Sequence, residues 1–211
     1  APLHHLLVRD SGCPLVMTSG NRSGEPIVYR DEDAVRRLAG VADFILTHDR
    51  PIHARCDDSV VRVTSSATCL VRRARGHAPT PIRLSETVPV PALALGGHLK
   101  NAFCLAAGRL AYMSPHVGDL DDLESYQSLR AGIATYSRLL GMEPAIVAHD
   151  RHPDYATTRL AGELSGTRGV AVQHHHAHVL SCAAEHGITG PVIGVAFDGA
   201  GLGEDGAIWG G

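Results

Sequence analysis

The sequence lacks any apolar run long enough to cross a membrane. No stretch of about 18 consecutive apolar residues occurs among its 211 residues. It also lacks a basic excess, because the formal net charge is −3. A protein that binds the phosphate backbone of nucleic acids needs such an excess. These absences exclude a transmembrane segment and argue against both a membrane and a nucleic acid as partner.

Cysteine pairing signals are missing as well. The five cysteines contain no C-x-x-C pair, and they are Cys13, Cys56, Cys69, Cys104 and Cys182. An odd number without paired spacing does not suit a disulfide framework. We therefore expect reduced thiols and a cytoplasmic protein.

The length and the prolines indicate how the chain is divided. The 211 residues, 44% of them hydrophobic, suffice for one large or two small domains with a buried core. Because the prolines between residues 77 and 91 disfavour helix and central strand, we expect a linker at 84–91. It would separate an upstream piece, 1–83, from a downstream piece, 92–211. Both chain ends have the composition of element interiors, so we expect a fragment of a longer protein.

The upstream piece is predicted to be α+β. Residues 14–19 have the pattern of a short strand, and 31–39 that of a helix with an acidic first turn. Two further strands are predicted at 59–63 and 69–72.

The downstream piece is predicted to be a mixed sheet with flanking helices. It would open with an antiparallel meander whose strands are 92–95, 102–106 and 109–113. Helices and strands then alternate, with helices at 119–140, 155–164 and 174–186 and strands at 145–148, 170–172 and 192–197. This order predicts an α/β fold and resembles the first half of an actin/sugar-kinase-like domain.

A histidine cluster is the sharpest chemical signal. The sequence holds 14 histidines, and residues 174–178 read H-H-H-A-H. His174 and His178 are four residues apart, so a helix projects both rings from one face, where they can chelate a divalent metal. Asp198, after an apolar run, is the predicted third ligand, and this set suits iron(II) or zinc. The alternative is a solvated polar face of the helix.

Two glycine-rich segments are candidate phosphate contacts. Gly199 and Gly201 lie in D-G-A-G-L-G-E-D-G, where repeated glycines let a backbone approach phosphate. Lys100 lies in G-G-H-L-K-N and can reach a nucleotide phosphate as a point charge. An ordinary glycine hairpin and a solvated lysine are the alternatives.

The upstream loops offer further polar groups. Ser19 and Asn21 lie in T-S-G-N-R-S-G-E-P, whose hydroxyl and amide groups suit phosphate or carbamate oxygens. Arg55 and Arg75 could contact phosphate through their guanidinium groups. An ordinary turn and local ion pairs explain the same residues without a ligand.

Taken together, these stretches resemble the [NiFe]-hydrogenase maturation carbamoyltransferase family, HypF. The matching motifs run in family order over nearly the whole chain. They are T-S-G-N-R-S-G-E-P, D-R-P-I-H-A-R-C-D-D-S-V-V-R, R-R-A-R-G-H-A-P, G-G-H-L-K-N-A-F-C-L, S-P-H-V-G-D-L, H-D-R-H-P-D-Y, Q-H-H-H-A-H and D-G-A-G-L-G-E-D-G-A-I-W-G-G.

The resemblance implies a two-step activity. Residues 1–83 would be the C-terminal part of a YrdC-like domain, which forms carbamoyl-adenylate from ATP with carbamoyl phosphate as carbamoyl donor. Residues 92–211 would be the N-terminal half of a TsaD-like domain, which transfers the carbamoyl group to a C-terminal cysteine thiolate of a HypE-type partner.

The same resemblance implies roles for individual residues. The expected nucleotide contacts are Ser19, Asn21, Arg55, Arg75, Gly199 and Gly201. Lys100 is the expected catalytic residue, and His174, His178 and Asp198 are the expected ligands of a divalent iron or zinc. Additional zinc is expected only in upstream modules that this sequence does not contain. Because further ligands and much of the nucleotide pocket would lie beyond Gly211, we expect this piece to be inactive alone.

Three other functions use similar parts. A small-molecule O-carbamoyltransferase has the same modules, but its TsaD-like module comes first. A threonylcarbamoyl-tRNA enzyme usually keeps the modules on separate chains. A non-catalytic metal-binding assembly module would need only the histidine cluster.

Overall fold

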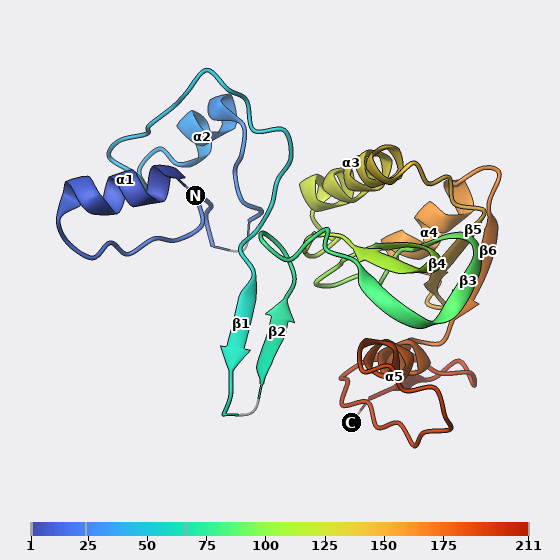
Figure 1. The fold of residues 1–211 in the computed structure, drawn as a ribbon. Helices are drawn as coiled ribbons and strands as arrows, with labels where there is room; N and C mark the ends of the chain where they lie inside the picture. The colour runs from blue at the N-terminus through green and yellow to red at the C-terminus, as the bar shows by residue number, and fades with distance from the viewer. Residues whose placement is uncertain (1, 24, 66, 211) are drawn as a thin grey trace. The chain divides into compact units, whose positions relative to one another are not determined.

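The computed structural model of the protein describes residues 2–23, 25–65 and 67–210. The chain divides into two compact units, residues 1–53 and 54–211. Helices and strands are mixed, as Figure 1 shows, and this confirms the predicted α/β class. None of the described helices has the length and apolar character that crossing a membrane requires.

The first unit contains two helices, α1 (Pro2–Ser11) and α2 (Asp31–Arg37). Three acidic residues open α2 and two arginines close it, an arrangement that complements the helix dipole. The helix predicted at 31–39 is therefore confirmed. The strand predicted at 14–19 is wrong, because this segment has no regular structure and Val16 is 97% exposed.

The second unit begins with an antiparallel ribbon. Strands β1 (Val60–Val63) and β2 (Thr68–Arg72) pair with each other, and this confirms both predicted strands. The ribbon forms a separate two-stranded sheet.

The main sheet of the second unit has the strand order β4-β3-β5-β6. β3 (Ile82–Ala94) and β4 (Cys104–Met113) are antiparallel, whereas β5 (Ile146–Asp150) and β6 (Arg168–Val172) run parallel to β3. The helices α3 (Leu123–Leu140), α4 (Ala156–Glu163) and α5 (His174–Glu185) alternate with the parallel strands as predicted. A two-residue pair, β7 (Gly201–Leu202) and β8 (Ile208–Trp209), follows.

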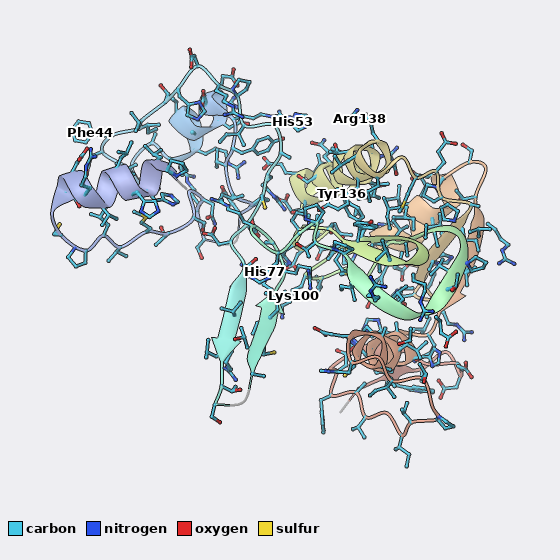
Figure 2. All side chains as sticks on the ribbon, in the orientation of Figure 1. Phe44, His53, His77, Lys100, Tyr136 and Arg138 are labelled. Carbon is cyan, nitrogen blue, oxygen red and sulfur yellow. The ribbon has the colours of Figure 1, made fainter. Side chains whose placement is uncertain are left out.

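The core lies between the sheet and α3 and α4. Its fully buried side chains include Leu93, Phe103, Leu129 and Val147. Tyr136 of α3, labelled in Figure 2, meets the Phe103 ring edge-on with centroids 5.3 Å apart. Helix α3 has a cap at each end: Asp122 accepts a hydrogen bond from the Ser125 N–H, and Gly141 adopts the left-handed conformation.

The prediction of a linker at 84–91, which rested on its prolines, is wrong. Residues 84–91 are not an irregular linker but the middle of β3. The register between β3 and β4 shifts on both sides of Val88, so Pro89 falls where the ladder is already interrupted. Beyond this interruption, Ala92, Leu93 and Ala94 also pair with β5. The division into domains 1–83 and 92–211 stays a prediction.

Two further strand predictions are wrong. The two strands predicted at 102–106 and 109–113 are one strand, β4, which begins at Cys104, because Gly108 forms a positive-φ irregularity within the strand rather than a hairpin turn. The buried strand expected at 192–197 is an irregular segment, and its Ile193 and Phe197 are 98% and 100% exposed. Its backbone rests on helix α5 instead, since a Cβ at Gly194 would lie 2.3 Å from Val179.

Candidate metal centre

The parallel part of the sheet places two polar segments at the same edge. Asp150 and Val172 are paired residues at the carboxyl ends of β5 and β6. Ligand sites of open α/β sheets commonly lie at this edge. Helix α5 begins two residues after Val172, at His174, and the Gln173 side chain caps it by accepting a hydrogen bond from the His176 N–H. The start of α5 is thus fixed beside Asp150.

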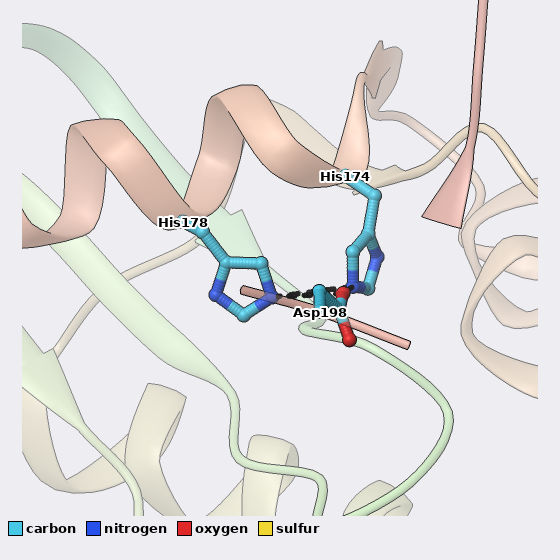
Figure 3. Close-up of side chains that lie close together, drawn as sticks. All are labelled: His174, His178 and Asp198. Carbon is cyan, nitrogen blue, oxygen red and sulfur yellow. Dashed lines mark hydrogen bonds and ion pairs between the residues drawn. The ribbon is translucent and has the colours of Figure 1, made fainter. Parts of the chain in front are cut away.

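Helix α5 directs two imidazoles to one point. His174 and His178 are one turn apart, and their Nε2 atoms lie 3.3 Å from each other. Asp198 faces both rings in Figure 3, with Oδ2 2.7 Å from His174 Nε2 and 3.4 Å from His178 Nε2. The structure therefore brings together the three side chains that were predicted as ligands.

The arrangement fits a divalent cation. Bond lengths of about 2.0–2.1 Å to zinc in tetrahedral geometry separate the ligand atoms by about 3.3 Å. Two of the three separations here, 3.3 and 3.4 Å, match that value. Asp198 Oδ2 is also a buried atom that accepts no well-formed hydrogen bond within the described part of the chain. An orphaned carboxylate oxygen that faces two Nε2 atoms is a cation-binding donor set.

Neighbouring groups keep Asp198 in its charged form. Burial acts to raise the pKa of Asp198, but His174, the Ala200 N–H and His178 outweigh it, so the pKa lies below its ordinary value. A carboxylate is the form that binds metals.

Sequence reasoning missed Asp150. Its Oδ2 lies 2.6 Å from His174 Nδ1, on the side of the ring opposite to Asp198. The motif H-D-R-H-P-D-Y contained this residue but gave it no role. The available signal was its position at the end of a predicted strand parallel to the one that leads into the histidine helix.

The glycine-rich segment packs against the histidine helix. The His175 ring stacks on Trp209, with centroids 5.9 Å apart. A Cβ at Gly201 would lie 2.5 Å from the His175 ring and 3.0 Å from His174, whereas a Cβ at Gly199 would meet nothing within 4 Å. Close packing thus explains the glycine at 201, and the phosphate contacts expected at both glycines stay predictions.

Lys100 lies in the turn next to the centre. It has a φ of +48°, and its N–H donates to Asp119 at 2.6 Å. A Cβ at Gly97 in the same turn would lie 3.8 Å from the His174 ring. Lys100, labelled in Figure 2, also lines a cavity of about 750 Å³ together with Arg72 and other residues of the second unit. Its catalytic role stays a prediction.

Ser19 and Asn21 form a tight turn in the first unit. The Asn21 N–H donates to the Ser19 carbonyl at 3.1 Å. The Asn21 side-chain amide donates to the carbonyls of Arg22 and Glu25, at 2.9 and 3.0 Å. The amide therefore stabilises the loop itself, and the nucleotide contact stays a prediction.

Arg55 and Arg75 have protein partners in the second unit. Arg55 donates to the Val117 carbonyl. Arg75 donates to the Cys56 carbonyl at 3.2 Å and lies 3.5 Å from Asp58. Both guanidinium groups hold neighbouring segments in place, and their expected phosphate contacts are likewise untested.

Two different family models match successive parts of the chain. The Sua5/YciO/YrdC family, described as telomere recombination, matches residues 1–74. The family described as the HypF Kae1-like domain matches residues 87–185. The chain thus joins a YrdC-type segment to a Kae1-like segment. The boundary between these matches does not coincide with the boundary of the compact units at residue 53.

Similarity to individual proteins identifies the family of this chain. The chain is 48% identical over 97% of its length to carbamoyltransferase HypF2 of Cupriavidus necator, and 45% identical over its whole length to carbamoyltransferase HypF of Synechocystis. A crystal structure of full-length HypF in a phosphate- and nucleotide-bound form matches the whole chain at 45% identity with a TM-score of 0.91. The chain belongs to the HypF carbamoyltransferase family. It spans 26% and 27% of the two relatives and 33% of the solved chain.

Proposed function

We propose that this chain is part of an enzyme that activates the carbamoyl group of carbamoyl phosphate with ATP and transfers it to a partner. The activated form is carbamoyl-adenylate, which forms with release of phosphate and pyrophosphate. A C-terminal cysteine thiolate of a HypE-type protein then attacks its carbonyl carbon, and AMP leaves. Two observations support this function. The chain belongs to the HypF family, and its second unit brings His174, His178 and Asp198 to one point.

The metal ligands and Lys100 would have separate roles in the transfer step. His174 and His178 would hold a divalent metal through Nε2, and Asp198 through Oδ2. A bound divalent cation would supply Lewis acidity at the carbamoyl carbonyl. Lys100, whose turn adjoins His174, would bind the adenylate phosphate and so fix the carbonyl for attack by the thiolate.

The convergence of the three predicted ligands carries this proposal. A surface histidine face would leave the rings in solvent, yet the His174 side chain is only 17% exposed and lies between two carboxylates. A non-catalytic metal-binding module would share this site. Only the transfer reaction separates the two functions.

The test replaces both histidines in a full-length family protein that contains this sequence. We expect His174→Ala with His178→Ala to remove one bound divalent metal and to abolish carbamoylation of the acceptor cysteine, measured by mass spectrometry. Replacement of His4 and His5 on α1 by alanine removes the same number of histidines and should change neither result. Metal binding and full transfer in the doubly substituted centre would disprove the site, and loss of metal with unchanged transfer would favour the non-catalytic module.

A further inference from the structure

Asp150 is a buried carboxylate whose two oxygens face different partners. Its side chain is 5% exposed. Oδ1 accepts a hydrogen bond from the His152 N–H at 2.9 Å, and Oδ2 lies 2.6 Å from His174 Nδ1. A buried carboxylate is costly unless hydrogen bonds compensate the lost hydration. Both oxygens meet that requirement, and the carboxyl group is therefore held in one orientation.

The fold fixes this carboxylate independently of helix α5. Asp150 ends β5, and its own carbonyl accepts a hydrogen bond from the Thr158 hydroxyl of α4 at 3.0 Å. The His152 N–H in the following turn holds Oδ1. Because sheet, turn and helix α4 all fix Asp150, the position of its Oδ2 constrains His174 rather than following it.

We propose that Asp150 positions His174 for metal binding by accepting the Nδ1–H of its ring. The ring then presents the Nε2 lone pair to the point where Asp198 Oδ2 and His178 Nε2 converge. Asp150 is not itself a ligand, because it contacts the opposite nitrogen of the ring. This role rests on the proposed metal centre and adds a residue that orients it.

An asparagine at position 150 reverses the polarity of this contact. Its carbonyl oxygen has to stay on the His152 N–H, because that N–H needs an acceptor. The amide nitrogen then takes the place of Oδ2 and presents a donor to His174 Nδ1. The ring can accept that bond only with its proton on Nε2, the atom that must bind the metal. Asparagine therefore keeps the shape of the side chain but favours the wrong tautomer.

The test measures Zn²⁺ affinity at this centre in a purified full-length family protein that contains this sequence, by competition with a chelator and by difference from its His174→Ala variant, using Zn²⁺ as the only probe. We expect Asp150→Asn to weaken Zn²⁺ binding by about 10–100-fold, the usual effect of removing such a partner. Asp150→Ala removes the acceptor without adding a donor, so we expect it to weaken binding no more than Asp150→Asn. The thermal midpoint of the metal-free Asp150→Asn protein should stay close to that of the original protein.

The chain offers a matched control. Asp121 Oδ1 lies 2.9 Å from His98 Nε2, and the Asp121 side chain is 81% exposed. Asp121→Asn changes a second histidine–carboxylate pair in the same way and should leave Zn²⁺ affinity unchanged. In the Zn²⁺-loaded protein, ¹⁵N NMR should show the proton of His174 on Nδ1.

The outcomes separate this role from the metal centre itself. An original protein that binds no Zn²⁺, or that binds it equally after His174→Ala, overturns the metal centre. If the original protein binds Zn²⁺ through His174 but Asp150→Asn binds it equally well, the positioning role alone is overturned. Weaker binding by Asp150→Ala than by Asp150→Asn would show that Asp150 acts through packing and would also overturn the role.

Discussion

The two glycines after Asp198 should respond differently to the same substitution. A Cβ at Gly201 would lie 2.5 Å from His175 Cε1 and 3.0 Å from two atoms of His174. Ordinary contacts between carbons are about 3.5–4.0 Å, so Gly201→Ala requires helix α5 or the glycine-rich segment to move by about 1–1.5 Å. Overpacking of this kind costs about 1–3 kcal/mol. A Cβ at Gly199 would have open space.

Of the two side chains that this Cβ would displace, His174 is a predicted metal ligand. Gly201→Ala should therefore lower the free energy of unfolding by about 1–3 kcal/mol and weaken Zn²⁺ binding. Gly199→Ala should change the free energy of unfolding by no more than about 0.5 kcal/mol. Urea unfolding of the metal-free proteins and Zn²⁺ competition titrations measure the two effects. Equal stability and equal Zn²⁺ affinity of the two variants would refute the packing argument.

Three other predictions concern the fold. Burial raises the pKa of Cys104 to about 11, so the unfolded chain loses this proton first as pH rises. The free energy of unfolding should fall by about 2–3 kcal/mol between about pH 9 and 11 through this thiol, and urea titrations of Cys104→Ala should lack that part of the fall. Asp122→Ala removes the cap of α3 and should cost about 1 kcal/mol by the same assay; no loss would contradict the capping role. Leu129→Ala, in the fully buried core, should cost about 2–5 kcal/mol, while Leu139→Ala, on the exposed face of α3, should stay within about 0.5 kcal/mol.

Local patterns predicted the alternating part of the second unit. The helix predicted at 119–140 ends as expected before Gly141, although it begins only after Asp122, and the short apolar runs at 145–148 and 170–172 became β5 and β6. The spacing of His174 and His178 predicted a shared face because that relation lies within one helix. These features depend on neighbouring residues, which a sequence displays directly.

Contacts between segments that lie far apart in the sequence could not be predicted from it. Asp150 meets His174 only because β5 and β6 are adjacent, parallel and in register, and no local pattern states that register. The apolar run at 192–197 indicated burial, but burial in a sheet needs a paired strand, and none is present among the described residues. The prolines at 89 and 91 were read as breakers, although an interrupted ladder can accommodate them.

The central claim is that His174, His178 and Asp198 bind one divalent metal. An anomalous difference map from Zn²⁺-soaked crystals tests it most directly. We predict one peak at about 2.0–2.2 Å from both Nε2 atoms and from Asp198 Oδ2. A map with no peak there, or with zinc bound only elsewhere on the chain, would contradict the claim.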